Sequence, residues 1–210
     1  MSNRLRFSLQ AAVGLCQAVL TLPAQAAPPV EDPDWPCQQR LVPELSAGTY
    51  WTGAPLPDGT DWRSDPRVAA LVEAVAPRDV PPDAGVAKIT AFVAALKPGE
   101  KDTLRATAFV GILDETNRER SQIIARLKEL ARRQREIAAQ AAKVADEIDA
   151  IPADATGEDA NRRTEAVNRR AFVTRAFDET RRTMRYACEA PTQLEARLGA
   201  YTKALQAEPR

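Results

Sequence analysis

Apolar residues recur with a seven-residue period through the longest stretch of the chain without proline. One series takes every seventh position: Phe109, Thr116, Ile123, Leu130, Ile137, Val144 and Ile151. A second series follows its first six members by four residues: Leu113, Arg120, Leu127, Gln134, Ala141 and Ile148. Alternating steps of four and three residues place one stripe along a helix, as in a coiled-coil seam. The pattern predicts a helix over about residues 100–150, roughly 75 Å long at about 1.5 Å per residue.

This predicted helix needs a partner, because an apolar stripe of that length cannot be covered within a small globular core. The partner is either another helix of this chain or a second copy of it. Three seam positions are polar, at Thr116, Arg120 and Gln134. Buried polar residues can fix the register of paired helices, and we expect Arg120 and Gln134 to do so.

Residues 151–157 contain Pro152 and Gly157 and predict a turn after the long helix. A second helical segment follows, with a less regular stripe: Val167, Ala171, Val173, Phe177, Thr180, Met184 and Cys188. Thr156 and Thr192 each have an acidic residue three positions later, which predicts helix caps at both. Short connections favour antiparallel neighbours. Residues 99–210 are therefore expected to form a long, coiled-coil-like helical hairpin with a short C-terminal helix.

Two shorter helices are expected within residues 65–98. Asp65 and Pro66 form a favourable cap and first turn, and Asp83 predicts a second cap. Residues 27–64 are rich in proline and tryptophan and show no strand alternation, so they predict an extended arm. The expected fold class is mainly α, with the hairpin, the two short helices and this arm.

Residues 1–26 have the features of a signal peptide. Arg4 and Arg6 precede an apolar stretch over residues 7–22, and Ala24-Gln25-Ala26 fits a small-x-small cleavage site. The expected location is the periplasm or the medium outside the cell. The alternative is an uncleaved N-terminal membrane anchor.

Removal of the signal peptide would leave two cysteines, Cys37 and Cys188. In an oxidising compartment their simplest state is one intramolecular disulfide, which would attach the arm to the hairpin. A redox-active thiol and a bond between chains are the alternatives. Neither cysteine lies in a Cys-x-x-Cys motif, which weakens the redox interpretation.

The chain contains no histidine, and its 29 basic and 29 acidic residues balance. The lack of histidine excludes a Ser-His-Asp triad and a histidine-ligated zinc site. The charge balance gives no support for bulk nucleic-acid binding. We therefore expect neither catalytic residues nor a metal or cofactor, and no nucleic-acid partner.

Four aromatic residues are concentrated in the arm: Trp35, Tyr50, Trp51 and Trp62. Aromatic side chains beside proline can form a recognition surface for a peptide or a sugar. Alternatively, these rings pack the arm onto the helices, since tryptophan and tyrosine bury large areas. Both interpretations stay open at this point.

Arginines are frequent on both segments of the predicted hairpin. Five are candidates for electrostatic docking to an acidic partner or for peripheral contact with anionic lipid: Arg126, Arg132, Arg133, Arg169 and Arg170. The alternative is a solvated surface with weak ion pairs between the helices.

Together these features predict an exported helical interaction protein that docks to a protein of the cell envelope as adaptor, assembly factor or accessory subunit. One alternative is a homo-oligomeric structural coiled coil. Another is a hydrolase of envelope carbohydrate or peptide, with carboxylates as its catalytic groups: Glu100, Asp102, Asp114 and Glu115. A hydrolase would need two of them to converge in a cleft.

Overall fold

The computed structural model describes residues 32–56, 59 and 61–208. The predicted signal peptide, residues 1–26, and the first residues of the arm lie outside the described residues. Within the described part of the chain, no helix combines the length and the apolar character needed to cross a membrane.

The described residues form helices joined by short connections, and no strand occurs among them. The elements in chain order are α1 (Ala47–Tyr50), the 3₁₀ helix η1 (Trp62–Ser64), α2 (Pro66–Val75), α3 (Pro82–Ala95), α4 (Lys101–Asp149), α5 (Glu158–Ala187) and α6 (Ala190–Gln206). The mainly helical fold and the long helix, which has 49 residues, are confirmed. The arm contains two short helical turns, α1 and η1, in addition to extended chain.

Of the four predicted helix caps, one is confirmed. The Asp65 carboxylate accepts a hydrogen bond from the Arg67 amide at 2.9 Å and caps α2. The caps expected at Asp83, Thr156 and Thr192 were wrong, because prolines and a glycine define those starts instead. Prolines occupy the first turns of α3 and α6, where a missing amide proton costs nothing. Gly157 precedes α5 with φ 64°, a conformation that glycine adopts readily.

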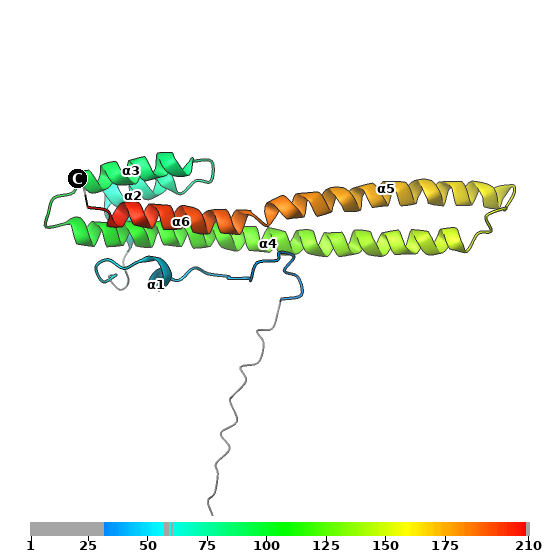
Figure 1. Ribbon diagram of the computed structural model, residues 1–210, viewed down its shortest axis with the longest axis horizontal. Coiled ribbons are helices and arrows are strands. Elements are labelled where there is room, and N and C mark those ends of the chain that lie inside the picture. Colours follow the sequence, from blue (N-terminus) through cyan, green and yellow to red (C-terminus); the bar gives the residue numbers. More distant parts are fainter. Residues whose placement is uncertain (1–31, 57–58, 60, 209–210) are drawn as a thin grey trace, which may run out of the picture. The chain divides into compact units, whose positions relative to one another are not determined.

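The main hydrophobic core lies where α2, α3 and α6 pack near the N-terminal end of α4 (Figure 1). α4 supplies Phe109 and Ile112 to this core, and α6 supplies Leu198 and Leu205. All four are almost inaccessible to solvent. The apolar side of α6 is thus buried in this core.

Every position of the predicted α4 seam is buried or half-buried, from Phe109 to Ile151. α6 and α5 lie end to end along α4 and cover this stripe (Figure 1). The predicted stripe of α5 is buried or half-buried from Val173 to Cys188, as expected, and differs only in its first part. Ala166 is buried, whereas Val167 and Ala171 are exposed, because a small alanine allows α5 to approach the larger side chains of α4.

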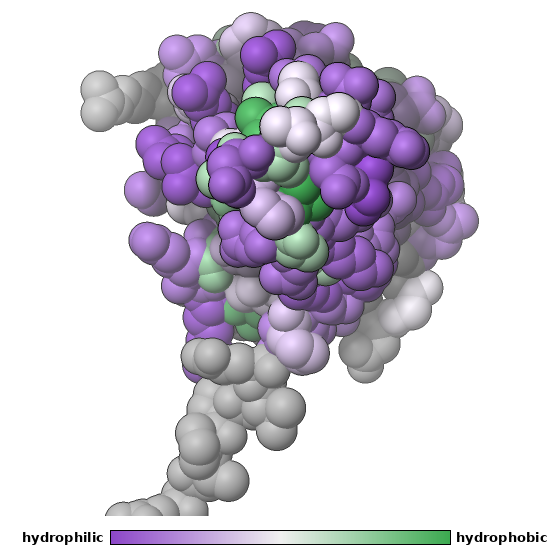
Figure 2. All heavy atoms as spheres, turned by 90° about the vertical axis from the view of Figure 1, so that its right-hand side faces the viewer, coloured by the Kyte–Doolittle hydropathy of each residue, from purple (hydrophilic) through white to green (hydrophobic). Residues whose placement is uncertain are grey.

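The turn between α4 and α5 is held by polar as well as apolar contacts. Val144 and Ile148 of α4 pack with Ala166 of α5. The Arg163 guanidinium donates to the carbonyls of Ile148 at 2.7 Å and Ile151 at 2.8 Å. These bonds satisfy acceptors that a helix end leaves open. Viewed from this end, the surface is mostly hydrophilic, with a few apolar side chains among the polar ones (Figure 2).

Gly111 allows the arm and α2 to pack closely on α4. A methyl group at this position would lie 2.8 Å from Val72 Cγ2 and 2.9 Å from the Trp62 ring. Gly199, within α6, has no atom within 4 Å of the corresponding position. Both glycines lie inside helices, so the two sites differ mainly in the space around them.

We expect Gly111→Ala to lower the free energy of unfolding by about 1–3 kcal/mol, since overpacking a buried contact forces neighbours apart. The matched variant Gly199→Ala should raise it by up to about 1 kcal/mol, because alanine is the better helix former. Urea denaturation followed by circular dichroism measures both values. Equal effects of the two substitutions would contradict the close packing at Gly111.

Candidate interaction surface

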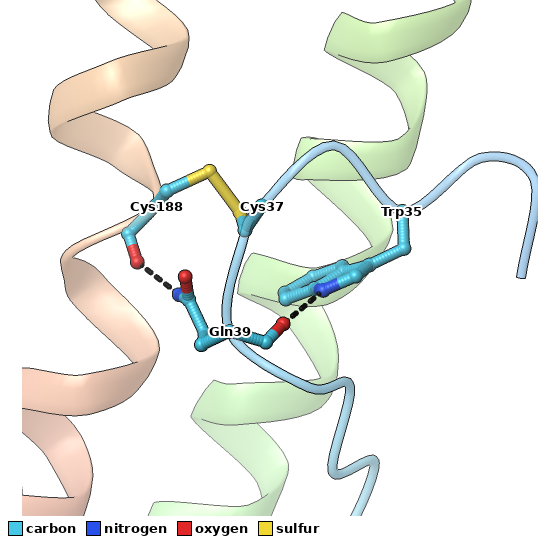
Figure 3. Close-up of a disulfide and its surroundings, with 4 residues drawn as sticks. All are labelled: Trp35, Cys37, Gln39 and Cys188. Carbon is cyan, nitrogen blue, oxygen red and sulfur yellow. Dashed lines mark hydrogen bonds between the residues drawn. A yellow bond between two sulfur atoms is a disulfide. The ribbon is translucent and has the colours of Figure 1, made fainter. Parts of the chain in front are cut away.

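A disulfide attaches the arm to the helices. Cys37 in the arm and Cys188, which directly follows α5, are bonded with an S–S distance of 2.00 Å and a Cα–Cα distance of 5.5 Å (Figure 3). The Cα–Cα distance lies below the limit of about 7 Å for a bridge. The expected cysteine pair is therefore brought together, across a sequence separation of 151 residues.

The surroundings of the disulfide fix the arm further. The Trp35 indole Nε1 donates to the Gln39 carbonyl at 2.7 Å, and the Gln39 amide donates to the Cys188 carbonyl (Figure 3). The disulfide cysteines and Trp35 pack against Ile123 and Leu127 of α4. The attachment point thus lies at the level of the α5–α6 junction.

Acidic residues at the start of the described arm pair with cations of α4. Asp32 accepts from Lys128 Nζ at 2.7 Å, and Asp34 accepts from Arg132 at 2.8 Å and also from Arg135. The hydrogen bond from Lys128 lowers the pKa of Asp32, and the bond from Arg132 lowers that of Asp34. Both carboxylates are charged at neutral pH. The ion pair with Asp34 therefore engages Arg132 within the chain.

Arg120 is a buried cation that joins three parts of the protein. Its side chain is 2% exposed and forms an ion pair with Glu195 of α6 at 2.8 Å. It also donates to the Val42 carbonyl at 2.7 Å and the Pro191 carbonyl at 3.1 Å. This polar seam residue therefore ties the arm, α4 and the start of α6 to one another.

The four aromatic residues of the arm all contact the helices. Trp62 is 5% exposed, and its Nε1 donates to Asp114 at 3.2 Å. Trp51 stacks on Phe109, with ring centroids 4.8 Å apart. Trp35 and Tyr50 are half-buried against the cores. This placement favours packing over a recognition surface for these rings.

The five candidate docking arginines are not gathered into one patch. Arg126, Arg132 and Arg133 belong to α4, whereas Arg169 and Arg170 belong to α5. Arg132 binds Asp34, and Arg169 pairs with Glu147 of α4. Arg126, Arg133 and Arg170 are exposed and have no ion-pair partner among the described residues. These three are available to another molecule.

The four carboxylates considered for hydrolysis lie at two separate places, Glu100 with Asp102 and Asp114 with Glu115. Asp102 and Asp114 are twelve residues apart on α4, about 18 Å along the helix. Paired catalytic carboxylates lie about 5–9.5 Å apart. Glu100 pairs with Arg67, and Glu115 pairs with Arg63 and Arg118. Two of the four therefore serve as partners of arginines.

The sequence analysis did not single out the exposed aromatic residues of α5. Phe172 is 72% exposed and Tyr186 is 71% exposed. Both fall outside the stripe that faces α4, and they lie fourteen residues apart, which is two seven-residue periods. That spacing is the sequence signal that could have identified them.

No family model, curated protein or solved structure matches this chain. The function is therefore argued from the residues of this chain alone. Its most distinctive groups are the attached arm and the exposed side chains of α5.

Removal of the disulfide tests how much the arm contributes to stability. The double variant Cys37→Ala/Cys188→Ala should lose up to about 5 kcal/mol of unfolding free energy, because the bond closes a loop of about 150 residues in the unfolded chain. Denaturation midpoints with and without a reductant measure the loss. Reductant should lower the midpoint of the parent protein and leave that of the double variant unchanged. A midpoint of the parent protein that is unchanged by reductant would contradict the disulfide between Cys37 and Cys188.

Substitution of Arg120 tests the polar junction. Arg120→Met should cost about 3 kcal/mol of unfolding free energy, because it leaves the carbonyls of residues 42 and 191 without their donor and Glu195 without its partner. The exposed Arg126→Met is the control and should change stability by less than about 0.5 kcal/mol. Chemical denaturation of both variants gives the comparison, and similar losses would refute a special role for Arg120.

Proposed function

We propose that this protein is an exported helical interaction protein that docks to a cell-envelope partner as an adaptor, assembly factor or accessory subunit. In this proposal α4 and α5 form an antiparallel, coiled-coil-like hairpin, and its outer surface is the docking device. The disulfide-linked arm supports the hairpin and is not itself the docking surface.

The observation that carries the proposal is that different elements pack on the two ends of α4. The main core takes its α4 side chains from the first turns of the helix, as far as Leu113. Near the far end, the apolar cluster contains only Val144, Ile148 and Ala166. Among the contacts between elements, α5 packs chiefly on α4. Two helices paired in this way add little to the main core but present long open faces, which suits binding another molecule.

The geometry of the arm supports this division of roles. Its disulfide, the Arg120 bonds and the Asp34 ion pairs all act near the α5–α6 junction. A junction fixed at several points gives the paired helices a defined direction from the main core. A preorganised surface loses less entropy on binding than a loose one.

Export is the part of the proposal that concerns location. It rests on the charged, apolar and small-residue regions of residues 1–26. The bonded cysteine pair supports it, because structural disulfides persist in oxidising compartments such as the periplasm. Cell fractionation and the mass of the isolated protein test this part. A protein that stays in the cytosol with residues 1–26 attached would refute it.

The docking proposal predicts photocrosslinks from the paired helices. A photoreactive residue at exposed Ala139 of α4 or Asn168 of α5 should yield one discrete adduct with an envelope protein in intact cells. Controls at exposed Lys88 of α3 and Glu73 of α2 should yield none, since these positions lie on the small helices. Adducts detected by blotting and identified by mass spectrometry give the answer.

Two outcomes would contradict docking to an envelope protein. Equal adducts from the helix pair and from the controls would show that contact is unspecific. Adducts of twice the mass of the chain would instead identify a homo-oligomer, and light scattering of the purified protein would then give the number of copies.

A further inference from the structure

The face of α5 that points away from α4 carries its own regular line of side chains. We call this set the outer line; its members are Asn168, Phe172, Arg175, Glu179, Arg182 and Tyr186, and each is exposed. Their spacings alternate between four and three residues, so they follow one another along a single side of the helix. The same alternation on α4 marks the stripe that other helices cover. A side chain pattern suited to a packed helix is thus present on a face that no described element covers.

The outer line contains two aromatic residues, one near its start and one at its end. Phe172 and Tyr186 are 72% and 71% exposed, and fourteen residues along a helix span about 21 Å. Single exposed apolar residues are normal on protein surfaces. Two aromatic residues at equivalent positions of one line, with arginines between them, have the composition that is enriched at the centre of interfaces.

The charges between the aromatic residues form an alternating pattern. Arg175, Glu179 and Arg182 give positive, negative and positive charge in order along the outer line. None of the three has an ion-pair partner in the part of the chain that the structure describes. Every basic residue of α5 is arginine, and none is lysine. Arginine binds carboxylates through two parallel hydrogen bonds, which lysine cannot do.

We propose that the outer line docks a helix of the partner protein, and that the facing side of this helix carries two carboxylates on either side of one cation. Its carboxylates pair with Arg175 and Arg182, its cation pairs with Glu179, and apolar residues at both ends contact Phe172 and Tyr186. This inference rests on the proposed function and specifies the partner surface. A helix is the fitting occupant because the four-and-three spacing matches helix against helix.

Two other occupants fit the outer line less well. In a second copy of the chain, packed antiparallel about Glu179, the two Glu179 side chains would face each other and the arginines would face no carboxylates of the line. A bilayer surface would need a broad apolar face. Here two rings about 21 Å apart are separated by three charged residues. The charge pattern therefore favours an acidic partner helix.

Two synthetic helical peptides test the charge pattern. Each is three heptads long with leucine at both end contacts; one carries Glu, Lys and Glu between them, and the other carries Lys, Glu and Lys. Fluorescence anisotropy with the purified protein should show that the first peptide binds at least about tenfold more tightly. The charge-reversed variant R175E/E179K/R182E should reverse this preference. All three substituted residues are exposed, so circular dichroism should show an unchanged helix content.

Matched variants test the aromatic contacts. F172A/Y186A should weaken binding of the first peptide by about tenfold or more. The control V167A changes an exposed apolar residue of α5 outside the outer line and should leave the affinity within about twofold. Equal affinity for both peptides, or a preference that survives charge reversal, would overturn the inference. Vesicles of phosphatidylglycerol and phosphatidylcholine in equal amounts serve as the competing probe. Binding to them that is lost in F172A/Y186A, without peptide discrimination, would assign the outer line to a membrane and also overturn it.

This inference and the proposed function can fail separately. A single partner captured from Ala139, together with no discrimination between the peptides, would leave docking through the helix pair intact and refute the outer line as its site. Peptide discrimination without any partner adduct in cells would support the outer line and count against the envelope partner.

Discussion

The apolar stripe of α4 has to be covered along nearly its whole length, and the positions of the other elements follow from that requirement. Burial of apolar surface contributes about 25 cal/mol per Å², so an open stripe of this length would be a strong driving force for association. Among the described residues, no other helix is long enough to cover it alone. α6 with the small helices covers the N-terminal part, and α5 covers the rest. The junction between the two covering helices lies at residues 188–189.

That junction is the weak point of such an arrangement, and several long-range ties meet there. A break in a covering helix leaves carbonyl groups without intrahelical donors. The Gln39 amide donates to the carbonyl of Cys188, which directly follows α5, and Arg120 adds a bond to the carbonyl of Pro191 in the first turn of α6. The disulfide adds a covalent tie at the same place. The arm is therefore best understood as a brace for the point where α5 gives way to α6.

The sequence predicted those features that depend on local pattern. The long helix follows from a seven-residue period without proline, and the α2 start follows from Asp65 and Pro66. The caps of α5 and α6 were assigned to the wrong residues, because threonine caps are weaker signals than the glycine and proline beside them. The first part of the inward line of α5 was misplaced, because alanine fits either face of a helix. Only the packing against Val144 and Ile148 of α4 shows that Ala166 is the residue that faces inward.

The contacts of the candidate site were less predictable, because they join residues that are far apart in the chain. Arg120 was recognised as a polar seam residue, but its acceptors at Val42 and Pro191 are 78 and 71 residues away. The sequence makes Arg132 a docking candidate, but in the structure its guanidinium pairs with Asp34, 98 residues earlier in the chain. Periodicity reports which side of a helix a residue occupies. It contains no information about which distant residue lies opposite.

The two faces of α5 explain why a partner helix would matter for stability as well as recognition. The inward face has only Ala166 and Met184 as fully buried residues, so its hold on α4 beyond the junction is modest. The outer line carries two exposed rings and unpaired arginines. A ligand that binds only the folded state stabilises it by RT ln(1 + [L]/Kd). Since α5 packs chiefly on α4, a helix docked on its outer face would stabilise the paired segment more than the main core. In the proposed complex, the least covered part of the chain is thus the part that gains most from its partner.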